Sequence, residues 1–106
     1  MREIDANEAA QLLADDADGT VLLDVREDAE LAVASVEGAL HIPMAQIPGR
    51  LSEIARDKTI ICMCHLGGRS AQVANFLSAH GYTQVVNLAG GIDAWSQLVD
   101  SNAPRY

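Results

Sequence analysis

The spacing of apolar residues at the start of the chain predicts a helix. Leu12 and Leu13 fall on one face of a helical segment over about residues 6–14. Asp5 and Glu8 have the spacing of an N-cap residue and its reciprocal partner, a combination that marks helix starts. We therefore expect the first helix to begin directly after Asp5.

Four short apolar runs predict strands. They cover residues 21–25, 39–42, 59–64 and 84–88, and Pro43 stops the second of them. Runs that are apolar throughout, without alternating polar positions, are typical of strands buried on both faces. Because parallel sheets bury their strands in this way, we expect parallel pairing.

The segments between these runs predict helices. They are residues 27–33, a segment opened by Pro48 that carries Leu51, Ile54 and Ala55, a segment of about ten residues from Ser70 that Gly81 stops, and a last segment with Ile92, Trp95, Leu98 and Val99 on its apolar face. Strands that alternate with helices predict an α/β fold. We expect a mainly parallel sheet of about five strands, flanked by helices on both faces and joined by right-handed crossovers.

Length and composition agree with a single domain over residues 1–106. The chain is 49% hydrophobic and 21% charged, which are ordinary values for a folded domain. Its two cysteines, Cys62 and Cys64, are too close in sequence to cross-link distant parts of a fold, and this favours a reducing compartment. Without an apolar leader or a run of roughly 20 apolar residues, we expect a soluble, cytoplasmic protein.

The negative charge lies in the first half of the chain. Residues 1–53 hold 12 acidic residues and three arginines, whereas residues 54–106 are nearly neutral, and the whole chain carries a net charge of −8. Nucleic acids and anionic membranes are bound through clustered Lys and Arg, so neither is expected as a partner. An anionic substrate would be received by the second half.

The candidate for chemistry is Cys64, which ends the predicted strand 59–64. In open α/β sheets, ligands bind beyond the carboxyl ends of the strands. The segment that follows Cys64 is polar and contains glycines, and it leads into the helix predicted from Ser70. This strand–loop–helix junction is therefore where we expect the functional site.

The same loop should favour the thiolate form of Cys64. Backbone N–H groups of a tight loop can surround an anion, the following helix directs its positive end inward, and Arg69 adds a full charge. Gly67 and Gly68 allow the backbone to curl and to adopt positive φ. These surroundings predict a reactive nucleophile rather than an inert apolar thiol.

Cys62 has the opposite interpretation, because it lies inside the predicted strand as a buried thiol. A Cys62–Cys64 disulfide and a metal site are the alternatives. A closed structural zinc site needs four ligands, and only His65 is adjacent. We therefore expect no metal.

Four stretches of the sequence resemble the rhodanese family of sulfurtransferases. The segment Cys64-His65-Leu66-Gly67-Gly68-Arg69-Ser70 is similar to the active-site loop of that family. The other stretches, which follow the family's order, are Leu23-Asp24-Val25-Arg26, Gly38-Ala39 with Ile42-Pro43, and Asn87-Leu88-Ala89-Gly90-Gly91-Ile92-Asp93-Ala94-Trp95. The resemblance spans about residues 20–96 and is to a single-domain rhodanese.

This resemblance implies that Cys64 accepts a sulfane sulfur from a small sulfur-containing anion, thiosulfate, or from a protein persulfide. The Cys64 persulfide would pass the sulfur to a thiophilic acceptor, either cyanide or a thiol, without a metal or an organic cofactor. The residues implied in substrate binding are those that follow the cysteine, namely His65, Leu66, Gly67, Gly68, Arg69 and Ser70.

Asp24 and Arg26 are candidate supporting residues, because they lie at a strand end on the expected side of the sheet. They either orient the loop and contact substrate, or they serve a structural ion pair in which Arg26 binds Glu30. We favour the structural role.

Two other functions compete with sulfur transfer. One is a non-catalytic rhodanese-like binding module, against which the intact Cys64 and Arg69 argue. The other is a phosphatase or arsenate reductase, in which five residues separate Cys from Arg, whereas this chain has four. His65 stands where many rhodaneses have Arg, and Glu37 adds an acid near the Gly38 turn, which leaves the sulfur donor open between thiosulfate and a protein persulfide.

Overall fold

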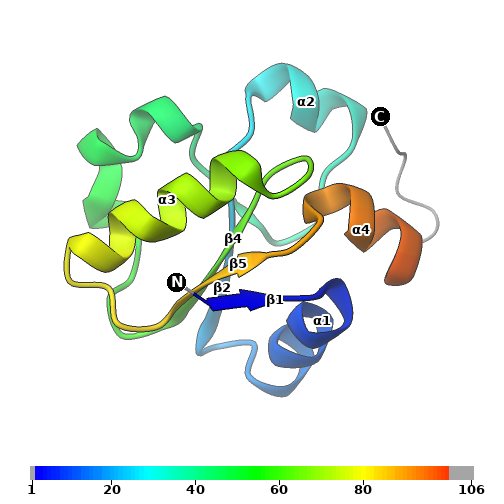
Figure 1. The fold of residues 1–106 in the computed structure, drawn as a ribbon, viewed down its shortest axis with the longest axis horizontal. Helices are drawn as coiled ribbons and strands as arrows, with labels where there is room; N and C mark the ends of the chain where they lie inside the picture. Colours follow the sequence, from blue (N-terminus) through cyan, green and yellow to red (C-terminus); the bar gives the residue numbers. More distant parts are fainter. Residues whose placement is uncertain (1, 101–106) are drawn as a thin grey trace.

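A computed structural model describes residues 2–100 of the chain. The strands are β1 (Arg2–Ile4), β2 (Thr20–Asp24), β3 (Leu40–His41), β4 (Thr59–Met63) and β5 (Val85–Leu88). The helices are α1 (Ala6–Asp15), α2 (Asp28–Val33), α3 (Gly68–Ala79) and α4 (Gly91–Leu98), with two 3₁₀ segments, η1 (Met44–Gln46) and η2 (Pro48–Glu53). The strands form one sheet in the order β1-β5-β4-β2-β3, in which every pairing is parallel (Figure 1).

Alternate residues of the central strand β4 divide the core into two halves. Ile60 and Cys62 face a cluster that includes side chains of α3, whereas Ile61 and Met63 face a cluster that includes side chains of α1 and α4. Figure 1 shows α3 on one side of the sheet and α1 and α4 on the other. The predicted α/β fold with helices on both faces is confirmed.

The first helix begins as its sequence predicts. The carboxylate of Asp5 accepts a hydrogen bond from the backbone N–H of Glu8 at 2.8 Å, and the two residues form a reciprocal capping box. The four predicted strands shift by one residue at one or both ends, and β4 ends at Met63, so Cys64 follows the strand instead of ending it. Two helical segments differ as well. α3 starts at Gly68 instead of Ser70. The segment opened by Pro48 is a 3₁₀ segment with a kink at Arg50, and it ends before Ile54 because the backbone is extended there.

The edge strand β1 was not among the predicted strands. Two of its three residues, Arg2 and Glu3, are polar and exposed, so the sequence has no apolar run there. Its third residue, Ile4, is buried and pairs with Leu88 of β5. Within residues 2–100, no helix has the length and apolar character needed to cross a membrane.

Candidate functional site

Cys64 lies at the carboxyl end of β4, immediately before the turn that leads into α3. Its sulfur accepts a hydrogen bond from the backbone N–H of Gly67 at 3.1 Å and is 3.3 Å from the hydroxyl oxygen of Ser70. The side chain is 1% exposed. The segment that we call the Cys64 loop (residues 64–69) thus folds back on the sulfur, as expected for a loop that holds an anion.

The hydrogen bonds of the loop favour the thiolate. Burial alone raises the pKa of Cys64, but the Ser70 hydroxyl and the backbone N–H groups of Ser70, Gly67 and Arg69 lower it by more, so that the pKa lies below its usual value. In contrast, burial and then the nearness of Cys64 raise the pKa of Cys62 to about 12. The pKa values of the two thiols are therefore shifted in opposite directions, and Cys64 is the candidate nucleophile.

This difference predicts selective alkylation. Iodoacetamide at pH 7 should modify Cys64 and leave Cys62 unmodified, because only thiolates react and only the pKa of Cys64 is lowered. Peptide mass mapping of the native chain and of a Cys64→Ser variant measures both sites. Modification of Cys62 in the folded native chain would contradict the assignment.

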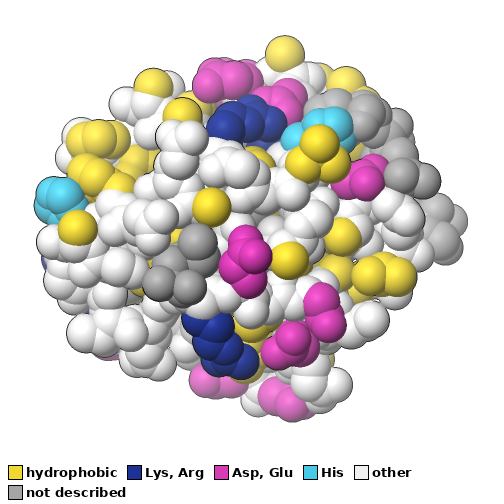
Figure 2. All heavy atoms as spheres, in the orientation of Figure 1, with side chains coloured by type: hydrophobic (Ala, Val, Ile, Leu, Met, Phe, Trp, Pro, Cys, Tyr) yellow, Lys and Arg dark blue, Asp and Glu magenta, His cyan; other side chains and the backbone are white. Residues whose placement is uncertain are grey.

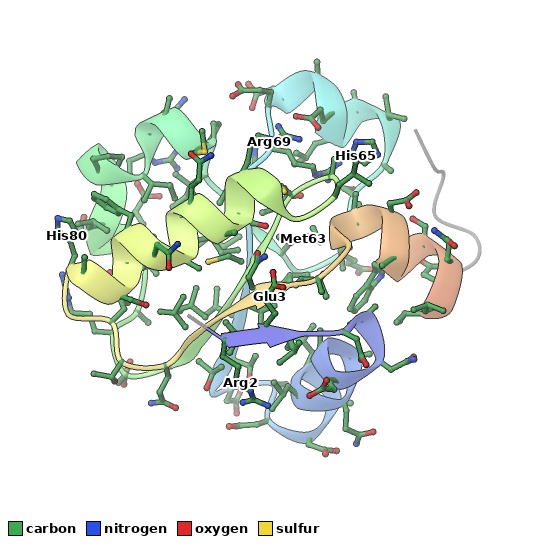
Figure 3. The ribbon with its side chains drawn as sticks, viewed as in Figure 1. Arg2, Glu3, Met63, His65, Arg69 and His80 are labelled. Carbon is green, nitrogen blue, oxygen red and sulfur yellow. The ribbon has the colours of Figure 1, made fainter. Side chains whose placement is uncertain are left out.

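The guanidinium of Arg69 binds a carboxylate. Its two terminal nitrogens are 2.5 and 2.8 Å from the oxygens of Glu30 on α2. Figure 3 shows Arg69 at the amino end of α3 beside α2, and Figure 2 shows basic and acidic side chains next to each other on this face. The full charge expected to act on Cys64 is thus offset by Glu30, and Arg69 favours the thiolate through its backbone N–H instead.

The two loop glycines have different roles. Gly67 has φ +113°, a left-handed conformation that other residues rarely adopt, and it precedes the first residue of α3. Gly68 lies within α3 without positive φ, and a Cβ at that position would meet open space. The expectation of backbone freedom is confirmed for Gly67 and is wrong for Gly68, because the helix begins earlier than predicted.

The amino end of α4 is hydrogen-bonded to the backbone of the Cys64 loop. The N–H of Ile92 donates to the carbonyl of Cys64 at 2.9 Å, and that of Asp93 donates to the carbonyl of His65 at 3.2 Å. Gly91 precedes them, and a Cβ there would lie 2.4 Å from each of those carbonyl oxygens. Gly91 of the sequence motif therefore lets one backbone segment approach another closely.

Asn87 of β5 contributes to the site, although sequence reasoning did not assign it a role. Its Oδ1 is 2.6 Å from the Ser70 hydroxyl, and its amide nitrogen donates to the carbonyl of Gly67 at 3.0 Å. It pairs with Cys62 in the sheet register, which places it on the face of β5 that adjoins Cys64. A polar residue inside an otherwise apolar strand was the available signal.

Asp24 and Arg26 form a buried ion pair beside the site. The guanidinium of Arg26 binds the carboxylate of Asp24 at 2.7 Å and donates to the carbonyl of Ala34 at 2.8 Å. Both side chains are almost fully buried. The predicted structural pair thus involves Asp24, and Glu30, the partner named from sequence, contributes its carbonyl oxygen at 3.4 Å to Arg26.

The remaining loop residues lie at the outer end of the site. Leu66 is 63% exposed, and His65 is partly buried and lies next to α2 (Figure 3). In the described part of the chain, no group of three or more His, Cys, Asp and Glu side chains is positioned to hold a metal ion. The chemistry that these residues offer is that of a thiol whose pKa is lowered by hydrogen-bond donors around it.

Comparison with known proteins extends over most of the chain. Residues 5–98 match the Rhodanese-like domain. A protein of Allochromatium vinosum named Sulfurtransferase is 42% identical over 97 residues, which are 92% of this chain and 90% of that protein. A protein of Tolumonas auensis named Thiosulfate sulfurtransferase is 32% identical over 77 residues, 73% of each chain.

A solved structure agrees with these matches. The Rhodanese-like Domain Protein of Staphylococcus aureus superposes with a TM-score of 0.84 at 31% identity, covering 100% of this chain and 99% of that one. Sequence, fold and the geometry of the Cys64 loop thus lead to one family. The chain belongs to the rhodanese-like domain family.

Proposed function

We propose that the chain is a sulfurtransferase that carries sulfur as a persulfide on Cys64. The observation that carries this proposal is the sulfur of Cys64, which is held by the N–H of Gly67 and the hydroxyl of Ser70 and has a lowered pKa. A thiolate at the bottom of such a loop is a nucleophile for a sulfane sulfur. The names of the Allochromatium and Tolumonas relatives support the same reaction class.

The reaction consists of two displacements. The Cys64 thiolate attacks the outer sulfur of the donor, so that a new S–S bond forms and the donor's own bond breaks, with its electron pair leaving on sulfite when the donor is thiosulfate. A thiolate or cyanide then attacks the terminal sulfur of the persulfide, and the electron pair of the broken bond restores the Cys64 thiolate. Each half-reaction is balanced without an external oxidant.

The loop stabilises the persulfide as well as the thiolate. The terminal sulfur would lie one bond beyond the Cys64 sulfur, toward the N–H groups of residues 65–69, and we propose that these groups bind it. Hydrogen bonds to a charged group are worth about 1.5–3 kcal/mol each. His65 and Leu66, at the outer end of the loop, are then the residues that meet the donor and the acceptor.

Turnover with thiosulfate and cyanide tests this proposal. We expect the native chain to produce thiocyanate and Cys64→Ser to produce none, because serine cannot hold a sulfane sulfur. Cys62→Ala is the matched control and should retain turnover, since its thiol is buried and un-ionised at neutral pH. Equal turnover by native chain and Cys64→Ser would rule out the reaction at this residue.

The phosphatase alternative receives no support from the arginine of the loop. In a phosphatase loop the arginine is needed for the phosphate oxygens, whereas the guanidinium of Arg69 binds Glu30.

The binding-module alternative predicts a chain that binds partners without forming a persulfide. A Cys64 adduct without thiocyanate production would instead indicate a sulfur carrier that needs a protein acceptor.

Glu30 should limit the use of anionic donors. Replacing it with glutamine removes the negative charge next to Arg69 and keeps an oxygen for the backbone N–H of Glu27. Thiosulfate carries two negative charges, so we expect kcat/KM for thiosulfate to rise by roughly 3- to 10-fold in Glu30→Gln, and more at low salt.

The matched control for this prediction is Glu53→Gln. Glu53 forms a comparable pair with Arg50 on η2, at 2.8 Å, outside the Cys64 loop. This control should leave kcat/KM unchanged. A decrease or no change in Glu30→Gln would show that the Arg69–Glu30 pair does not control donor choice.

A further inference from the structure

The hydroxyl of Ser70 has more potential hydrogen-bond partners than protons. Its oxygen is 2.6 Å from Oδ1 of Asn87, 3.3 Å from the sulfur of Cys64 and 3.3 Å from the carbonyl oxygen of Gly67. A hydroxyl carries one proton and donates one strong hydrogen bond at a time. Asn87 and Cys64 therefore compete for that proton, and Asn87 is the closer acceptor.

The side chain of Asn87 is fixed in the orientation that makes it an acceptor for Ser70. Its amide nitrogen donates to the carboxylate of Glu3 at 2.8 Å and to the carbonyl of Gly67 at 3.0 Å. A rotated amide would place its oxygen against those two acceptors, so only one orientation is favourable. Glu3 pairs with Asn87 in the sheet register, and Figure 3 shows it on β1.

This competition matters because the negative charge moves during sulfur transfer. In the free enzyme the charge is on the sulfur of Cys64, whereas in the persulfide it is on the terminal sulfur and the Cys64 sulfur is neutral. Ser70 and Asn87 are fully buried, so water does not supply an alternative partner. A hydroxyl with two acceptors can follow that change by rotating.

We propose that Asn87 is a positioning residue for the Ser70 hydroxyl. While Cys64 carries sulfur, the hydroxyl donates its hydrogen bond to Asn87. When the negative charge returns to the Cys64 sulfur, the hydroxyl donates to that sulfur instead. This inference rests on the proposed function. Only the hydroxyl rotates, so its proton stays bonded to the Ser70 oxygen and no covalent bond forms or breaks. The hydrogen bond to Cys64 appears as the thiolate leaves, which stabilises it in the second displacement.

The same competition acts on the resting enzyme, and there it can be measured. Ser70 stabilises the Cys64 thiolate only to the extent that its hydroxyl donates to the sulfur and not to Asn87. Besides Cys64, the charged or titratable residues on the Cys64 loop and on β1, β2, β4, β5, α2, α3 and α4 are Cys62, His65, Arg69, Arg2, Glu3, Asp24, Asp28, Glu30 and Asp93. Variants that leave all of these unchanged report on hydrogen bonding and not on charge.

The test is the pH profile of Cys64 alkylation by iodoacetamide, which needs no sulfur donor. We expect Ser70→Ala to raise the midpoint by about one pH unit, because the thiolate loses a donor. Asn87→Leu should lower the midpoint by about half a unit, because the hydroxyl is then left to the sulfur. The midpoint of the variant with both Ser70→Ala and Asn87→Leu should equal that of Ser70→Ala, since without the hydroxyl Asn87 has no hydrogen bond to withhold from the sulfur.

Asn87→Leu leaves no evident unsatisfied group that would prevent folding. The carbonyl of Gly67 still accepts from the N–H of Ala71 at 3.1 Å, and Glu3 is exposed to water. If the role of Asn87 were only to maintain the loop conformation, Asn87→Leu would raise the midpoint. It would also shift the midpoint by the same amount in the native and the Ser70→Ala backgrounds. Either result would overturn the proposal.

A second variant keeps the proposal testable if the leucine variant does not fold. Asn87→Val is a smaller apolar replacement that suits a strand and also removes the acceptor, so it should lower the midpoint with Ser70 present and leave it unchanged in the Ser70→Ala background. Equal shifts in the two backgrounds would overturn the proposal. Glu3→Gln, which keeps an acceptor for the Asn87 amide and removes a charge, is the control, and any shift it causes should be the same with and without Ser70→Ala because it does not act through the hydroxyl. Because alkylation requires no turnover, a failed sulfurtransferase assay would be distinguishable from a failure here.

Discussion

Replacing Gly91 with alanine is expected to reduce sulfur transfer by about 100-fold, the usual effect of a misplacement of roughly 1 Å at a reacting group. The new Cβ would lie 2.4 Å from the carbonyl oxygens of Cys64 and His65, which are backbone atoms and cannot rotate away. The same oxygens accept the hydrogen bonds that fasten the loop to α4. Relief of the contact therefore moves the Cys64 backbone, and kcat for thiocyanate production measures the result.

Gly38→Ala separates this clash from backbone strain. Gly91 and Gly38 both have positive φ, of +58° and +83°, but a Cβ at Gly38 would meet nothing within 4 Å. We expect it to lose about 1–2 kcal/mol of stability, the left-handed penalty for a residue with a side chain, and to keep its activity. If Gly91→Ala retained activity as well as Gly38→Ala does, the close approach of α4 would not matter for the loop.

Replacing Arg26 with methionine is expected to destabilise the fold by about 3–5 kcal/mol. The carboxylate of Asp24 is 1% exposed and would lose a partner bound at 2.7 Å, which leaves a negative charge in the core. The carbonyl of Ala34 would lose its donor at 2.8 Å as well. Domains are stable by about 5–15 kcal/mol in total, so this single change removes a large share.

Urea unfolding monitored by circular dichroism measures this loss. The matched control is Arg50→Met, which breaks an exposed pair with Glu53 and should change the stability far less, because water screens an exposed pair. Adding Asp24→Asn to Arg26→Met removes the stranded charge, and we expect part of the stability to return. A loss as small as in the control would mean that the buried pair contributes little.

Most of the fold could be predicted because its strands are apolar and its helices amphipathic. Strands such as β4 have buried side chains on both faces, and this leaves a continuous apolar run in the sequence. β1 leaves no such run, since it pairs with β5 through its backbone at all three residues and only Ile4 is buried. Its assignment requires the tertiary structure.

The cysteine and its loop could also be predicted, but the partners of that loop could not. Local spacing places Cys64, Gly67 and Ser70 together because they are neighbours in the chain. The Arg69–Glu30 pair spans 39 residues, and the contact of Asn87 with Ser70 depends on the register of β4 with β5. Such contacts depend on how the elements pack, which residue spacing does not determine.

Intact mass after treatment with a sulfur donor tests the central claim, a persulfide on Cys64, most directly. Thiosulfate or a protein persulfide should add the mass of one sulfur atom to the native chain and to Cys62→Ala, and a thiol reductant should remove it. Cys64→Ser should gain nothing. The same reducible adduct on Cys64→Ser, or no adduct on the native chain from either donor, would contradict the account.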